Sequence, residues 1–150
     1  MECLCLEDSY YSWDLERKLF RKEKSLKEQK ILRLATVDGK GNPHLVPVWY
    51  KKIGKKFYIG TNIKTTKAKN IRKNSKVCFC IDEGVKSPIN GVMGIGRARL
   101  ILGKTKVERL AGKILLRYFK SLDEKWAKIL LDGTNCIIEI TPSKMTSWHY

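Results

Sequence analysis

The sequence predicts an α+β fold in which mainly antiparallel strands form a barrel or a sandwich with helices beside it. Short strand-like runs follow one another across tight turn signals, and only a few helical patterns interrupt them. The chain has 150 residues, of which 43% are hydrophobic and 31% are charged. This length and composition suit one hydrophobic core, so residues 1–150 are expected to form a single domain.

The N-terminal part, residues 1–30, is expected to be helical. In residues 13–30, Leu15, Leu19 and Leu26 recur at helical spacing, while charged residues occupy the other face.

Three strands are predicted next. Residues 31–37 have the pattern of a buried strand, and the turn-rich stretch "DGKGNP" is expected to close a hairpin with residues 44–52. Pro47 lies inside the returning strand and has no N–H to donate, which predicts a sheet edge or an interrupted ladder. A turn at Gly54 leads to the third strand, residues 55–61.

A short helix over residues 64–74 is expected before two further strands. The glycines of "GVMGIG" in the second of these predict a β-bulge or a close approach of the backbone by a ligand. Helical patterns then cover residues 104–131, with a break near residues 121–123. The four strands expected in this half of the chain are residues 76–82, 91–102, 134–142 and 144–150.

The charge of the chain is strongly positive, with 31 Lys and Arg against 15 Asp and Glu and a net charge of +16. Such a surface favours anionic partners, either nucleic acid or phosphorylated small molecules. No apolar run approaches the ~18 residues of a membrane span, and the N-terminus lacks the pattern of a signal peptide. We therefore expect a cytoplasmic protein without a membrane partner.

Several common site types are not indicated. The glycine spacing in "GVMGIG" does not fit a dinucleotide fingerprint, and "GKT" at residues 103–105 lacks the earlier glycine of a P-loop. The two histidines lie far apart in the sequence, so neither a catalytic triad nor a metal centre is expected. The five cysteines are an odd number without C-x-x-C spacing, and Cys78 and Cys80 are expected to be small buried hydrophobes.

The stretch "GTNIKTTKAKNI", residues 60–71, combines hydroxyl groups and lysines at the start of a predicted helix. A phosphate at that position requires free N–H groups, hydroxyl donors and a cation. Thr65, Thr66 and Lys67 supply the hydroxyls and the charge. Two threonines are otherwise a poor choice inside a helix, although they could simply cap it.

Two motifs together resemble the pyridoxamine 5'-phosphate oxidase-like, flavin-binding split-barrel proteins. "LATVDGKGNPHLVPVWY" is similar to the opening hairpin of that family, and "FYIGTNIKTTKAKNI" is similar to its phosphate segment. The closing "IIEITPSKMTSW" resembles the last strands of the family. The resemblance implies a six-stranded antiparallel Greek-key split β-barrel with flanking helices, and a homodimer with flavin at the interface.

The resemblance also implies FMN as the cofactor and a flavin-dependent oxidoreductase acting on a small-molecule redox substrate. A strand along the flavin ring and a phosphate segment then form the site, with a C-terminal tryptophan reaching it from the other subunit. The expected cofactor-binding residues are Val46, Pro47, Val48 and Trp49 on the strand, Thr61, Asn62, Thr65, Thr66 and Lys67 in the phosphate segment, and Trp148.

Two alternatives remain open at this point. Relatives of this fold bind a deazaflavin coenzyme, whose longer acidic tail would suit a charge of +16. A basic barrel that binds nucleic acid is less expected, although the aromatic-rich "VWYKKIGKKFY" offers aromatics interleaved with lysines.

A true pyridoxamine-phosphate oxidase is not expected. The namesake enzymes of the family carry Arg at the position that matches His44 and Lys at the position that matches Trp49. They also continue beyond the position of Tyr150 into a substrate-contacting segment. The missing groups are cations, and a phosphate-ester substrate needs them.

Overall fold

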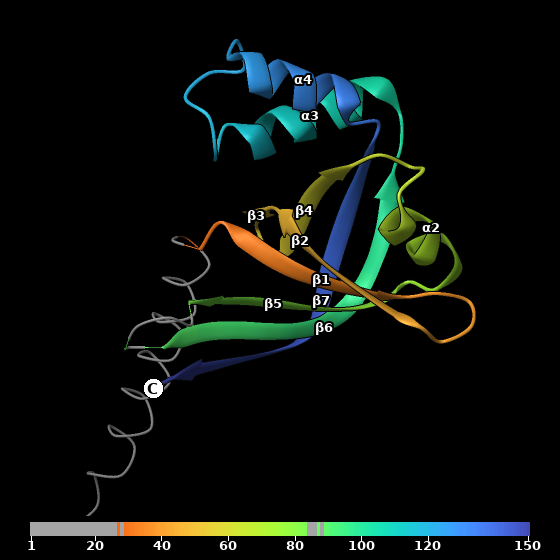
Figure 1. Cartoon of the computed structure of the whole chain (residues 1–150), viewed down its shortest axis with the longest axis vertical. Coiled ribbons are helices and arrows are strands. Elements are labelled where there is room, and N and C mark those ends of the chain that lie inside the picture. Colours follow the sequence, from red (N-terminus) through yellow and green to blue (C-terminus); the bar gives the residue numbers. More distant parts are fainter. Residues whose placement is uncertain (1–26, 28, 84–86, 88) are drawn as a thin grey trace, which may run out of the picture.

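The computed structural model describes residues 27, 29–83, 87 and 89–150. Within them, seven strands form one curled antiparallel sheet in the order β2-β1-β5-β6-β7-β4-β3, and three helices lie around it (Figure 1). The predicted helical segment 1–30 falls almost entirely outside the described residues. The elements are β1 Ile31–Val37, β2 Pro43–Trp49, β3 Lys51–Ile53, β4 Lys56–Thr61, α2 Thr66–Lys73, β5 Lys76–Glu83, β6 Asn90–Ile101, α3 Lys104–Leu115, α4 Lys125–Gly133 and β7 Cys136–His149.

The α+β class and the split-barrel architecture are confirmed, but the described sheet has seven strands rather than six. The predicted strand 44–52 is divided at Tyr50 into β2 and β3. The N–H of this buried residue donates to the Tyr118 hydroxyl (2.8 Å), which in turn donates to the Tyr50 carbonyl (2.9 Å). In contrast, the two strands predicted after residue 134 are the single strand β7.

The β1–β2 hairpin forms as predicted, with Ile31 opposite Trp49 and Val37 opposite Pro43. The carboxylate of Asp38 accepts hydrogen bonds from the side-chain amide of Asn42 (3.0 Å) and from the backbone N–H groups of Asn42 (2.9 Å) and Lys40 (2.8 Å), and these bonds lower its pKa. β2 is the first strand of the sheet, which confirms the edge position expected from Pro47.

The glycines of β6 make room for protein atoms. A β-bulge lies between Ile95 and Gly96, as the sequence predicted. A Cβ on Gly91 would lie 2.1 Å from the Trp148 ring, and one on Gly94 would lie 2.3 Å from the Phe79 ring. These glycines are therefore explained by close packing within the chain, without a ligand.

The main hydrophobic core lies inside the curl of the sheet, around Phe57, Phe79 and Ile138. A second cluster lies on the other side of the sheet, where α3 packs on Ile101 and Ile137. α3 and α4 form a pair at one end of the sheet (Figure 1). α2 connects β4 to β5, which are not neighbours in the sheet, and packs on β1 and β6.

Candidate functional site

The loop between β4 and α2 is held by its own hydroxyl and amide groups. The N–H and the hydroxyl of Thr65 both donate to the Asn62 carbonyl, at 3.0 and 2.8 Å. The side chain of Asn62 accepts the N–H of Lys64 (2.9 Å), and the Thr61 and Thr65 hydroxyls lie 3.2 Å apart. These contacts bring together Thr61, Asn62 and Thr65, three of the residues that the sequence predicted.

The first turn of α2 is open to an anion. Thr65 is the N-cap residue, but its hydroxyl makes no cap hydrogen bond because it is turned toward the Asn62 carbonyl. The simple capping explanation of the Thr65–Thr66 pair is therefore wrong. The first turn also contains no acidic residue. The N–H groups at the start of such a helix carry a partial positive charge and favour an anion.

α2 is anchored through its other face. Ala68, Asn70 and Ile71 are buried, and the Asn70 amide donates to the Thr36 hydroxyl on β1 (3.1 Å). This anchoring fixes the direction of the helix start relative to the sheet. Thr66, the first residue of the helix, remains exposed.

Lys67 lies beside this helix start and is partly buried. Burial lowers the pKa of its ammonium group. In the described part of the chain no carboxylate pairs with it, so its charge is available to an anionic ligand. Lys67 also lines a pocket of about 200 Å³ together with Val48 and Trp49 of β2. The structure thus brings the predicted cation next to the predicted ring-contacting strand.

The side chains of β2 alternate between the two faces of the sheet. Val46 and Val48 are partly buried, and Val48 packs against the barrel core. Pro47 and Trp49 are exposed on the outer face. The Trp49 ring stacks on Tyr118 with centroids 4.3 Å apart and packs edge-on to Phe119 at 5.7 Å. Tyr118 follows α3 and bonds to Tyr50, a role that the sequence did not reveal.

Trp148 is not near the phosphate segment within one chain. It lies near the C-terminal end of β7, directly opposite Gly91, whereas Thr61 pairs with Cys136 at the start of the same strand. Gly91 and Trp148 lie in the outer face of the sheet, because the flanking Val92 points into the core. Trp49 lies in the same outer face.

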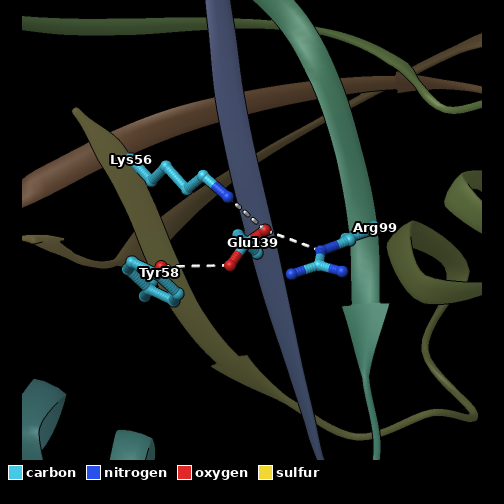
Figure 2. Close-up of polar contacts among 4 residues, drawn as sticks. All are labelled: Lys56, Tyr58, Arg99 and Glu139. Atoms are coloured by element: carbon cyan, nitrogen blue, oxygen red, sulfur yellow. Dashed lines mark hydrogen bonds and ion pairs between the residues drawn. The ribbon is translucent and has the colours of Figure 1, made fainter. Parts of the chain in front are cut away.

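Glu139 is a buried carboxylate that sequence reasoning missed. Figure 2 shows its contacts with three side chains on the flanking strands: Lys56 Nζ at 3.0 Å, Tyr58 Oη at 3.0 Å and Arg99 Nε at 2.6 Å. These bonds, that from Arg99 above all, lower the pKa of Glu139 to about 2. Burial, and after it the same carboxylate, raises the pKa of the Tyr58 hydroxyl.

This cluster is structural in character. A carboxylate with a pKa of about 2 stays ionised near neutral pH and is a poor proton donor or acceptor. It joins β4, β7 and β6 through one side chain. The signal in the sequence was a single Glu inside the apolar run "CIIEITP", but its partners are 40 or more residues away.

The described residues present neither a cluster of metal ligands nor a membrane-spanning helix. No group of three or more His, Cys, Asp and Glu side chains is placed to hold a metal there. Cys78 and Cys80 are partly buried on one side of β5, whereas full burial was expected, and Cys136 is buried. None of the helices in the described ranges is long and apolar enough to cross a membrane.

Comparison with known proteins identifies a family. The family model described as pyridoxamine 5'-phosphate oxidase matches residues 21–149. Among curated proteins there is no significant match.

Solved structures share the fold at low sequence identity. A conserved hypothetical protein of Mycobacterium tuberculosis has a TM-score of 0.73 at 23% identity, with 84% of this chain and 81% of that chain covered. A Clostridium acetobutylicum protein of the pyridoxinephosphate oxidase family has a TM-score of 0.69 at 19% identity, with 90% of each chain covered. The heme storage protein HutZ of Vibrio cholerae has a TM-score of 0.68 at 15% identity, with 85% of this chain and 90% of that chain covered.

Proposed function

The chain belongs to the pyridoxamine 5'-phosphate oxidase family, and on that premise we propose that it is an FMN-binding oxidoreductase that is not a pyridoxamine-phosphate oxidase itself. The observation that carries the proposal is the open start of α2, where free N–H groups, threonine hydroxyls and Lys67 meet beside β2.

The phosphate of FMN would lie at this helix start. Lys67 would supply the cation, and the hydroxyls of Thr61, Thr65 and Thr66 would donate hydrogen bonds once rotated toward the phosphate. Asn62 would hold the loop in shape through its bonds to Lys64 and Thr65. Burial destabilises the charged form of Lys67 when no anion lies beside it. A phosphate dianion would offset this cost through a charge-assisted hydrogen bond.

The flavin ring would lie along β2, from Val46 to Trp49. Edge strands present backbone N–H and C=O groups that are not used in the sheet, and these would face the ring. Pro47 and Trp49 would contact it from the outer face of the sheet. Bound FMN supplies the hydride and electron transfer, while the protein supplies binding, orientation and electrostatics.

A homodimer would complete the site. The outer face of β1, β2, β5 and β6 exposes large apolar side chains, of which Leu45 is 64%, Met93 46% and Ile95 50% accessible. A contiguous apolar surface of this kind usually marks an interface. Because Trp49 and Trp148 both lie in this outer face, a partner seated on it would bring its own Trp148 toward the β2 site.

Two substitutions argue against turnover of pyridoxamine phosphate. His44 takes the place of an arginine and Trp49 that of a lysine, relative to the namesake enzymes. Histidine is mostly neutral near pH 7, and tryptophan carries no charge. A phosphate-ester substrate would therefore lose two cationic contacts.

The deazaflavin coenzyme is the second candidate cofactor. Its acidic tail would suit the exposed cations Lys69, Arg72 and Lys73 on α2, which have no ion pair among the described residues. The aromatic stretch that suggested nucleic-acid binding is mostly engaged within the chain, so we do not favour that alternative. Of the aromatics in residues 48–58, Tyr50 and Phe57 are buried, Tyr58 bonds to Glu139 and Trp49 is stacked on Tyr118.

The test is a titration of FMN fluorescence with the wild-type chain and with Lys67→Ala. A charge-assisted hydrogen bond contributes about 1.5–3 kcal/mol, so the variant should bind FMN roughly ten- to a hundred-fold more weakly. Lys69→Ala is the matched control, because Lys69 lies on the same helix but does not line the pocket. Equal losses in both variants would show a general charge effect and remove Lys67 from the site.

A further inference from the structure

An open hollow lies on the outer face of the sheet, over the neighbouring strands β1, β5, β6 and β7 (Figure 1). Its volume is about 850 Å³. It shares no lining residue with the pocket beside Lys67. The residues that line it are Ala35, Val37, Lys76, Val77, Cys78, Ile95, Gly96, Arg97, Thr141, Pro142 and Ser143.

The β-bulge between β6 and β7 shapes one side of this hollow. The register shifts between Ile95 and Gly96, and Ser143 is the extra residue of β7. Gly96 lets the two strands approach closely, because a Cβ there would lie 2.3 Å from the Thr141 carbonyl oxygen. The Ser143 hydroxyl donates to the Ile95 carbonyl (3.2 Å) and so fixes the bulge. Bulges bend a strand and redirect its side chains, and they are common beside binding sites.

Two cations stand side by side in the hollow. Lys76 of β5 and Arg97 of β6 are directly opposite in the pairing register, and both are exposed. Like charges in such positions destabilise a sheet. The Arg97 guanidinium donates to the neutral Ser75 hydroxyl (3.0 Å), and among the described residues neither cation has an ion pair. Thr141, opposite Arg97 on β7, adds an exposed hydroxyl.

No carboxylate neutralises these cations within the hollow, because its lining contains neither Asp nor Glu. Asp38 directly follows Val37, but its carboxylate accepts hydrogen bonds inside the β1–β2 turn. Glu139 lies two residues before the hollow on β7 and is held by Lys56 and Arg99. The hollow therefore carries an uncompensated positive charge that an anion would offset.

The rest of the hollow is apolar. Ala35 and Val37 of β1 line it on one side, and Ile95 and Pro142 line it on the other. The Ile95 side chain is 50% accessible. The next outward side chain of β6, Arg97, is charged, so the apolar outer face that we assign to the dimer ends at this hollow. A ligand that matches these walls needs an anionic head and an apolar part.

We propose that this hollow is a second binding site, which takes an organic anion with an apolar group, such as an aromatic phosphate. Lys76 and Arg97 hold the anionic head, and the Thr141 hydroxyl donates to it. The apolar group lies against Val37 and Ile95. None of these residues belongs to the proposed FMN site, so the two proposals stand or fall separately.

Cys78 provides a reporter for this site, because it is partly buried and lines the hollow. The experiment alkylates the whole chain with iodoacetate or with its uncharged analogue iodoacetamide and measures labelling of Cys78 by peptide mass spectrometry. Arg97→Gln should slow the reaction with iodoacetate about three- to ten-fold, since the local field that attracts the anion is weakened. It should leave the reaction with iodoacetamide unchanged. Cys80 is the internal comparison, because it lies on the same strand outside the hollow.

The ligand class is tested by protection of Cys78 from iodoacetamide. Naphthyl phosphate should protect with a dissociation constant on the order of 1 mM, and naphthol and inorganic phosphate should each be about ten-fold weaker. Arg97→Lys should retain most of the protection, whereas Arg97→Gln should lose it. Arg109→Gln is the matched control, because Arg109 is an exposed residue of α3 outside the hollow and its loss removes the same charge. Lys67→Ala should leave the protection of Cys78 unchanged.

Each contrary outcome has a distinct meaning. Absence of protection by naphthyl phosphate, or equal effects of Arg97→Gln and Arg109→Gln, would overturn the site. Equal protection by naphthol would overturn the anionic class, and equal protection by inorganic phosphate would overturn the apolar part. Labelling of Cys78 that slows with rising protein concentration, without any anion, would show that a second copy of the chain fills the hollow. Lys76→Gln decides the question if Arg97→Gln does not fold, and flavin fluorescence reads FMN binding separately.

Discussion

Replacement of Glu139 by glutamine should lower stability in a pH-dependent manner. The carboxylate is 5% exposed and bonds to Lys56, Tyr58 and Arg99. Its pKa falls from 4.5 to about 2 on folding, and one pKa unit corresponds to 1.36 kcal/mol. The ionised carboxylate therefore contributes about 3 kcal/mol at pH 7.

The direction of the pKa shift determines how this stabilisation depends on pH. Because the pKa is lower in the folded chain, this stabilisation is complete above about pH 4.5 and disappears as the pH falls through about 2. Roughly 2 kcal/mol of it should be lost by pH 3. In Glu139→Gln, the amide still accepts one hydrogen bond, and the exposed parts of Lys56 and Arg99 reach water. We therefore expect a loss of about 2–3 kcal/mol at pH 7.

The assay is urea unfolding of both chains between pH 7 and pH 3 at fixed salt. The difference in the free energy of unfolding should shrink by about 2 kcal/mol over this range. Glu108→Gln is the control, since Glu108 is exposed on α3 and its substitution should change stability by less than about 0.5 kcal/mol. A difference between wild type and Glu139→Gln that stays constant from pH 7 to pH 3 would refute the reasoning.

Three other predictions concern the dimer, the substrate and the Tyr118 contacts. Ile95→Glu should weaken the dimer at least ten-fold in sedimentation equilibrium because it places a charge in the apolar outer face. Leu102→Glu, at an exposed apolar position beyond β6, should leave the dimer unchanged, and equal effects of the two variants would place the interface elsewhere. With FMN and oxygen supplied, the chain should form no pyridoxal phosphate from pyridoxamine phosphate. Turnover of about 1 per second, a modest enzyme rate, would contradict the roles given to His44 and Trp49. Tyr118→Phe removes the bonds to Tyr50 and should cost about 1–2 kcal/mol in urea unfolding, whereas Tyr150→Phe should be neutral.

The local features of the fold were predictable because local chemistry determines them. The turn residues around Asp38 closed the predicted hairpin, and Pro47 marked an edge strand. The glycines of β6 marked the bulge near Gly96. The sequence also allowed a ligand beside these glycines, but the rings of Phe79 and Trp148 fill the space. Both rings come from other strands, so the sequence of β6 alone could not show this.

The missed features all depend on contacts between distant residues. The break at Tyr50 depends on the hydroxyl of Tyr118, 68 residues further along the chain. The Glu139 cluster requires β4, β7 and β6 to be neighbours, which periodicity does not reveal. In contrast, the phosphate segment is contiguous, so the sequence indicated Thr61, Thr65 and Lys67 together. The same pattern could not show that the Thr65 hydroxyl turns to Asn62 and leaves the helix start open.

The most direct measurement of the central claim is gel filtration of the FMN-loaded chain with light scattering and a full absorption spectrum of the eluted peak. The account predicts an oxidised-flavin band that elutes with protein at twice the chain mass of 17.3 kDa, at one FMN per chain. A colourless peak after incubation with FMN would contradict flavin binding. A heme-type Soret band on the purified protein in place of the flavin band would contradict the assignment of the cofactor, and a yellow monomer would contradict the site shared between two chains.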